Sequence, residues 1–269
     1  MSGVTNNALE VDHVTKVFRD FWLRPKVRAV NDICFNVGRG EVFGLLGPNG
    51  SGKSTTLKMV LGLLNPTAGR IRILCGSPHD NSVKATTGYM PEETYLYKHL
   101  TARESLDFFG RIFDLPPAVR RERVNQLIEM SGLKNTTRMK IGDYSKGMAR
   151  KIGLAQALIN DPELLILDEP TSGLDPVACR QVKDLVLTLA KRGKTIIMAS
   201  HVLSDVQDVC NRVAILCNGQ VKVQGRVADI LDGRKNLEEL FLDVIAGSQS
   251  DAAGRATSGG PVPEYLTGK

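Results

Sequence analysis

The stretch "GLLGPNGSGKSTTLK", residues 44–58, contains three glycines, a proline and a lysine within eight positions. The apolar run VFGLL leads into it, and residues 55–64 have a helix-like pattern. From Gly47 to Ser54 the residues match G-x-x-x-x-G-K-[ST], which forms a phosphate-binding loop when a strand precedes it and a helix follows. Glycine-rich turns before helices are common, but the complete pattern in this setting is not. The stretch therefore predicts a nucleoside triphosphate site.

Each part of this loop has an expected task. Its glycines let successive backbone N–H groups point inward, and the helix N-terminus adds its dipole. We expect Lys53 to reach the β- and γ-phosphates and Ser54 to give its hydroxyl to Mg²⁺. The predicted nucleotide-binding residues of the loop are Gly47, Pro48, Asn49, Gly50, Ser51, Gly52, Lys53, Ser54 and Thr55.

A second candidate element is the apolar run PELLILDEP, residues 162–170, which contains two adjacent acids. Such a run is typical of a strand buried on both faces, and acids at its carboxyl end face the crevice where parallel sheets bind ligands. Asp168 is predicted to hold Mg²⁺, directly or through water, and Glu169 to activate a water that attacks the γ-phosphate. An apolar run followed by acids is weak evidence alone, but strong evidence when a phosphate loop precedes it.

The rest of the chain alternates strands and helices. Residues 8–18, residues 29–37 and RIRIL read as strands, whereas residues 100–159 have helical apolar spacing. A helix is expected from Pro176, capped by Asp175 and closed by Gly193; the buried strand KTIIMAS follows it. NGQVKVQG suggests a hairpin at a sheet edge, and Asn236 with Glu239 a helix start. The alternation predicts an α/β fold with a largely parallel sheet.

Composition sets outer limits on function. The 269 residues allow one large domain or two small ones, and the 42% of apolar and 24% of charged residues are ordinary for a globular protein. No apolar run approaches the roughly 20 residues of a membrane span, and the first residues lack a signal-peptide pattern. Five cysteines without a CxxC pair favour reduced thiols over disulfides or a zinc site. The net charge of +6 suits an anionic partner, but equally a mildly basic surface.

The residues between and after these elements indicate one family. "YSKGMARKIGLAQALINDPELLILDEPTSGLD", residues 144–175, resembles the signature region of ABC transporter ATPases, usually written LSGGQ. Here Tyr144 stands for Leu, Lys146 for Gly and Met148 for Gln. This form is similar to the drug- and polysaccharide-exporter branch of prokaryotic ABC ATPases. The resemblance covers residues 8–246, with five motifs in the family's order.

The resemblance implies further site residues. Ser145, Lys146, Gly147 and Met148 would complete, in trans, the ATP site of a second copy, and Asp175 would belong to the D-loop. His201 would contact the γ-phosphate and help to orient Glu169. Phe18 would stack on adenine. Glu92 stands where the family usually has a glutamine that ligates Mg²⁺ and senses the transport domain.

These assignments give the complete predicted site. The predicted catalytic residues are Glu169, His201 and Lys53. The predicted metal ligands are Ser54, Asp168 and Glu92. Three of the assignments also have a purely structural interpretation. Ser145 could be a simple N-cap, His201 an ordinary residue at a helix start, and Phe18 part of the core.

The resemblance also implies a domain organisation. It predicts an ABC ATPase domain over residues 1–246, with a P-loop NTPase core (1–92 and 161–225) that has a mostly parallel sheet. An N-terminal antiparallel β-subdomain, a helical signature subdomain over about 93–160 and a short helix over 236–246 would complete it. Residues 247–269 are rich in Gly, Ser and Pro and are predicted to be a disordered tail.

The function implied is an ATP-binding and ATP-hydrolysing subunit that drives a separate transmembrane permease, here an exporter, by ATP-dependent closure of a dimer. ATP and Mg²⁺ are the expected cofactors, and the expected location is the inner face of the cell membrane. A groove near Tyr95, Leu96, Tyr97 and Leu100 would receive the permease. The alternative is an ABC ATPase that acts on nucleic acid or ribosomes, but those proteins carry two cassettes or a long coiled-coil arm. No nucleic-acid partner is therefore expected, and the cargo is set by the permease.

Overall fold

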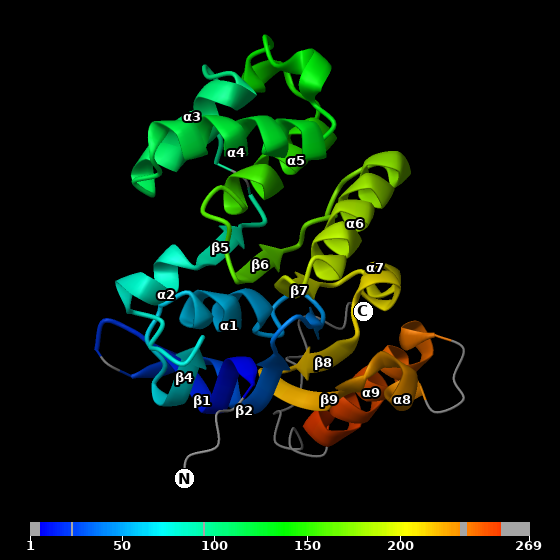
Figure 1. Cartoon of the computed structure of the whole chain (residues 1–269). Helices are drawn as coiled ribbons and strands as arrows, with labels where there is room; N and C mark the ends of the chain where they lie inside the picture. Colours follow the sequence, from blue (N-terminus) through cyan, green and yellow to red (C-terminus); the bar gives the residue numbers. More distant parts are fainter. Residues whose placement is uncertain (1–5, 23, 94, 232–235, 254–269) are drawn as a thin grey trace, which may run out of the picture.

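Two sheets form the centre of the molecule, shown in Figure 1. The structure is a computed structural model that describes residues 6–22, 24–93, 95–231 and 236–253. One sheet has the antiparallel order β2-β1-β4, and the other has the mostly parallel order β5-β6-β7-β3-β8-β9. This arrangement confirms the predicted α/β fold class. The strands are β1 (Asn7–Arg19), β2 (Pro25–Gly38), β3 (Val42–Leu46), β4 (Ala68–Ile73), β5 (Thr87–Met90), β6 (Leu164–Asp168), β7 (Thr195–Ser200), β8 (Arg212–Cys217) and β9 (Gln220–Arg226).

The helices lie around these sheets and in a separate group, α3 to α5, at the top of Figure 1. In the described part of the chain, no helix is both long enough and apolar enough to cross a membrane. The helices are α1 (Lys53–Val60), α2 (Asn81–Ala85), α3 (Ala102–Ile112), α4 (Pro117–Met130), α5 (Lys146–Ala157), α6 (Pro176–Lys191), α7 (Leu203–Val209), α8 (Val227–Leu231) and α9 (Leu237–Ala253), with short 3-10 turns at Lys134–Thr136 and Ile141–Asp143.

The parallel sheet gathers three chain segments at one edge. Strand β7 pairs in parallel with β3 on one side and with β6 on the other. All three strands are buried along their whole length, which explains their unbroken apolar sequences. Their carboxyl ends are Leu46, Asp168 and Ser200. Parallel pairing therefore places the phosphate loop, the two acids and the segment of His201 side by side.

The antiparallel sheet is irregular near its middle. Strand β1 pairs with β2 and β4, and its Leu9, Val11 and Val14 side chains are buried in the core. Val11 pairs with Phe35, but the next pair is Val14 with Ile33. Two residues of β1 thus oppose one residue of β2, which is a β-bulge.

The helical group is joined to the parallel sheet by apolar packing. Leu106 of α3, Leu127 of α4 and Leu154 of α5 belong to the same buried cluster as Leu165 of β6. Helix α3 begins with a capping box, in which the Thr101 hydroxyl accepts from the Glu104 backbone and the Glu104 carboxylate accepts in return. The group is therefore packed onto the core rather than tethered to it.

Several element boundaries differ from expectation. Helix α6 begins at Pro176 with Asp175 as its cap, as predicted. Helix α1 begins two residues before the expected Thr55 and ends at Val60, and the short strand β5 was not expected. Helix α9 continues to Ala253, so part of the segment predicted to be disordered is helical. The remaining residues of that segment, 254–269, lie outside the described residues.

Candidate functional site

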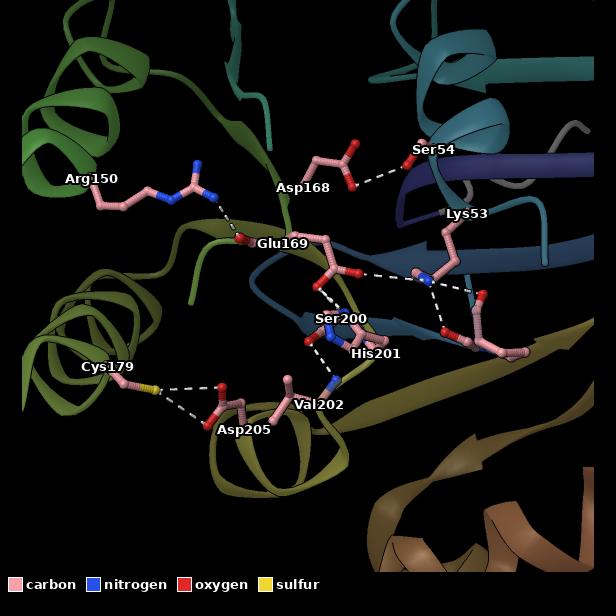
Figure 2. A network of polar contacts seen from close by, with 12 residues as sticks. Lys53, Ser54, Arg150, Asp168, Glu169, Cys179, Ser200, His201, Val202 and Asp205 are labelled. Atoms are coloured by element: carbon pink, nitrogen blue, oxygen red, sulfur yellow. Dashed lines mark hydrogen bonds and ion pairs between the residues drawn. The ribbon is translucent and has the colours of Figure 1, made fainter. Parts of the chain in front are cut away.

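The phosphate loop is closed tightly around two glycines (Figure 2 shows its surroundings). A Cβ atom at Gly47 would lie 2.4 Å from the Leu216 carbonyl oxygen, and one at Gly52 would lie 2.6 Å from the Ala29 carbonyl oxygen. Both contacts are with rigid backbone, so a side chain at either position would force the loop open. The buried Ser51 hydroxyl has no hydrogen-bond partner within the described part of the chain. These features fit a cradle that is completed by a polar ligand.

Lys53 opens helix α1 and is almost fully buried, with 5% of its surface exposed. Its Nζ donates to the Gly47 carbonyl at 2.7 Å and to the Pro48 carbonyl at 3.3 Å. The same ammonium lies 3.6 Å from Oε1 of Glu169. The lysine thus bridges the phosphate loop and the acid.

Ser54 and Asp168 meet across the site. The Ser54 hydroxyl donates to Oδ1 of Asp168 at 3.4 Å, a long contact that leaves both oxygens available. Burial raises the pKa of Asp168; the Ser54 hydrogen bond lowers it, whereas the charges of Glu169 and Glu92 raise it. Such an excess of negative charge favours a bound cation. A hydroxyl and a carboxylate are hard oxygen donors of the kind Mg²⁺ prefers, so these residues fit the metal.

Glu169 lies between Lys53 and His201, as Figure 2 shows. It is 4% exposed, and its backbone adopts a left-handed conformation with φ of 49°, which is rare outside glycine. Oε2 lies 2.8 Å from Nδ1 of His201 and accepts the His201 backbone N–H at 3.4 Å. The strained turn after β6 therefore aims the carboxylate along the site, away from the strand's regular alternation.

Sequence reasoning missed Arg150. This residue of α5 is buried; its guanidinium donates to the Pro91 carbonyl at 3.1 Å and to the Glu169 carbonyl at 3.0 Å. Burial lowers its pKa, and the charges of Glu92, Asp168 and Glu169 raise it. The arginine ties the helical group to the backbone of the segment after β5 and to the backbone of the turn after β6. One signal was available: Arg150 occupies the same helical face as Gly147 and Leu154, where an apolar residue is normal.

The signature residues pack against the neighbouring D-loop. The Ser145 hydroxyl accepts from the Met148 N–H at 3.2 Å and caps α5. A Cβ at Gly147 would lie 2.8 Å from the Ala178 methyl, and one at Gly173 would lie 2.1 Å from Nζ of Lys146. Asp175 accepts from the N–H groups of Val177 and Ala178. Within the described part of the chain, residues 145–148 make no hydrogen bond or ion pair with Lys53 or Ser54.

Two predicted ligands lie at the margins of this arrangement. Phe18, near the end of β1, is partly exposed, and the Lys16 ammonium lies 5.4 Å from the centre of its ring. Glu92 is exposed on the segment after β5. Burial raises the pKa of Tyr89 to about 12, with further contributions from the charges of Asp168 and Glu92. Glu92 is therefore within electrostatic range of the acids, and its oxygens are free to approach a metal.

The predicted permease groove begins three residues after Glu92. Tyr95 is 80% exposed, and Tyr97 is 46% exposed with its ring 5.4 Å from that of Phe108 in an edge contact. Leu96 is half-buried and packs against a small cluster that contains Ala102, Leu133, Ile141 and Ile152. Leu96 thus fixes this segment to the helical group, while both tyrosines remain accessible.

Comparisons with known proteins agree on one family. The family model described as ABC transporter matches residues 30–172. An uncharacterised ABC transporter ATP-binding protein of Synechocystis sp. is 40% identical over 252 residues, which are 93% of this chain and 70% of the relative. A Nod factor export ATP-binding protein I of Cupriavidus pinatubonensis is 38% identical over 239 residues, 86% of this chain and 73% of the relative.

Solved structures point the same way. The structure of an ATP-binding subunit of an ABC transporter matches with a TM-score of 0.77 at 30% identity, covering 88% of this chain and 99% of the other. That of cbiO1 from Clostridium perfringens, part of the ABC transporter complex cbiONQ, matches with a TM-score of 0.76 at 27% identity, covering 88% and 95%.

Proposed function

The chain belongs to the ABC transporter family as an ATP-binding, ATP-hydrolysing subunit, and we propose that it powers an exporter whose membrane-spanning part is a separate permease. Two copies would close around two ATP molecules, and hydrolysis would open them again. The Nod factor export relative supports the exporter assignment. The proposed place of work is the inner face of the cell membrane, where the permease would hold the subunit.

The dimer is proposed because the signature residues, 145–148, lie apart from the phosphate loop, residues 47–54, within one copy. Ser145 and Gly147 lie at the start of α5, where Gly147 approaches Ala178 of α6 and the adjacent Lys146 approaches Gly173 of the D-loop. A helix N-terminus attracts phosphate, because its first N–H groups and the helix dipole favour anions. A second copy in a two-fold arrangement could present this terminus to the γ-phosphate held here.

Hydrolysis would follow from positioning and charge. Lys53 would hold the β- and γ-phosphates, and Ser54, Asp168 and Glu92 would hold Mg²⁺, which supplies charge neutralisation on the phosphates when bound. Glu169, fixed by His201 and facing Lys53, would accept a proton from the attacking water. His201 would then steady both the carboxylate and the phosphate. Phe18 would stack on adenine at the edge of the antiparallel sheet.

Mixing two inactive variants tests the shared site. Lys53→Ala removes the phosphate contact in its own copy, and Ser145→Arg blocks the surface offered to the other copy. Each variant alone should lack ATPase activity. A heterodimer of the two variants keeps one intact site, so mixing them should restore part of the activity. As a control, the Lys53→Ala variant mixed with a Lys53→Ala/Ser145→Arg double variant has no intact site and should stay inactive. Wild-type turnover by Ser145→Arg alone, or no recovery on mixing, would contradict the shared site.

A further inference from the structure

The bulge in the antiparallel sheet assembles three metal-binding side chains. Between the pairs Val11–Phe35 and Val14–Ile33, Asp12 and His13 together oppose Cys34. In a regular strand, consecutive side chains point to opposite faces. His13 departs from this rule with a left-handed φ of 49°. One ligand atom from each of Asp12, His13 and Cys34 consequently lies within 4.8 Å of the others.

We propose that Asp12, His13 and Cys34 bind a divalent metal ion of the zinc class. A carboxylate oxygen, an imidazole nitrogen and a sulfur form a mixed set that suits Zn²⁺, whereas Mg²⁺ takes oxygen ligands. Three protein ligands leave a fourth position for water or a ligand from another molecule. Among the described residues, this is the one group of three or more such side chains that lies close enough to share an ion.

Asp32 supplies the support that a histidine ligand requires. Its Oδ1 lies 2.8 Å from Nδ1 of His13, which leaves Nε2 for the metal. A carboxylate in this role fixes the ring orientation and makes the imidazole a better ligand. Asp32 itself has a left-handed φ of 52°, and its N–H donates to the Thr15 hydroxyl at 2.9 Å. The strained backbone of His13 on β1 and of Asp32 on β2 thus fixes the orientation of the His13 imidazole.

The environment of Cys34 also favours a metal-bound sulfur. The His13 backbone N–H donates to Sγ of Cys34 at 3.1 Å, and a donor of this kind helps to orient a metal ligand. Cys34 is half-buried, while Asp12 and His13 are exposed, so an ion could enter from solvent. The opposing influence is Arg70, which pairs with Asp12 in register on β4. Its positive charge should weaken the site without blocking it.

This site is separate from the nucleotide site. None of its residues belongs to the phosphate loop, the two acids or His201, so the inference does not depend on the proposed function. The sequence contains no CxxC pair, and the cluster forms only through the pairing of β1 with β2. A metal there would hold these two strands together at one of the irregular points of their pairing.

Cobalt titration of the full chain, with any affinity tag removed, tests the proposal. Co²⁺ bound through a cysteine gives a sulfur-to-metal absorption band in the near ultraviolet, and Zn²⁺ should displace it. Cys34→Ser should abolish the band, while the control variants Cys75→Ser and Cys179→Ser should keep it. His13→Ala and Asp32→Asn should each weaken Zn²⁺ binding by about 10-fold or more. Arg70→Gln should strengthen it.

ATP binding by each variant serves as the check of folding. A Cys34→Ser variant that binds ATP normally but lacks the band would support the site. Wild-type protein with no such band, or a band of equal size in Cys34→Ser, would overturn it.

Discussion

The nucleotide site and the tyrosine segment that follows Glu92 differ in how firmly their side chains are held within a single copy. Lys53 and Glu169 are about 95% buried; Lys53 contacts Gly47 and Glu169, and Glu169 also contacts His201. Tyr95 is 80% exposed, and its hydroxyl donates a hydrogen bond to the carboxylate of the nearby Glu93. The side chains of the first region are already fixed by their contacts, whereas the second region presents an aromatic surface of the kind that binds a partner.

The difference suggests a division of labour within one chain. Parallel strands can bring distant residues to one edge with fixed spacing, so catalytic groups belong there. A surface for a partner must stay open until the partner arrives. Arg150 links the two regions, because it donates to Pro91 near the tyrosines and to Glu169 in the site. Changes that break one region should leave the other intact, and changes to Arg150 should affect both.

The largest effect is expected for Glu169→Gln. The amide cannot accept the proton of the attacking water, so ATPase turnover should fall by about 100-fold or more. Ser54 and Asp168 remain, so ATP binding should persist, and the ATP-bound dimer should accumulate. Turnover assays and size-exclusion chromatography with ATP measure this. Glu122→Gln, an exposed change on α4, is the control, and a Glu169→Gln variant with wild-type turnover would refute the assigned role.

Arg150→Met should come next. It removes the hydrogen bonds to Pro91 and Glu169 and leaves these two backbone carbonyls without their charged donor, each worth about 1–2 kcal/mol. We expect the free energy of unfolding to fall by about 3 kcal/mol, together with a loss of turnover, because Glu169 loses its backbone support. Urea unfolding and ATPase assays test this, with the exposed Arg121→Met as the control. Loss of stability with unchanged turnover would show that Arg150 supports only the fold.

Tyr95→Ala should spare the core and weaken assembly. The side chain reaches neither phosphate nor metal, so ATP binding and melting temperature should stay near wild type. An aromatic residue buried by a permease should be worth more than about 1 kcal/mol of binding, so co-purification in detergent should drop clearly. Trp22→Ala is the matched control, since Trp22 is 72% exposed in the loop between β1 and β2. Equal loss in both variants would mean that the surface is wrongly placed.

The sequence predicted those parts that depend on local pattern. The loop from Gly47 to Ser54, the strand ending in Asp168 and the cap at Asp175 are each defined by a few adjacent residues, and their local structures were correctly expected. The functional roles assigned to the site residues stay predictions, those of Lys53, Asp168 and Glu169 as much as those of Phe18, Glu92 and His201. Strand β5 was missed because it has only four residues, one of them Gly88, too few for a periodic pattern.

Arg150 and the bulge were missed for a different reason. The arginine's partners, Pro91 and Glu169, come from separate segments, and only packing shows that it faces them. Cys34 meets His13 because the register of β1 and β2 slips by one residue, and no sequence pattern fixes that slip. Contacts of long range in sequence therefore marked the limit of prediction in this chain.

The smallest expected effect concerns Asp161, which joins the end of the helical group to the core. The Lys194 ammonium donates to its carboxylate at 2.5 Å, and this hydrogen bond lowers the pKa of Asp161. A carboxyl group whose pKa is lowered by folding stabilises the protein above its unfolded pKa, about 3.9, and loses that contribution as pH falls through the folded value. Asp161→Asn should therefore destabilise the protein near neutral pH. Because the side chain is 62% exposed, the loss should be below about 1 kcal/mol. Urea unfolding of both proteins from about pH 7 to about pH 2 should show a constant difference down to about pH 4 and a shrinking one below it. Asp229→Asn, an exposed change on α8, should show no such trend, and a difference that grows as pH falls would contradict the stabilising contact between Asp161 and Lys194.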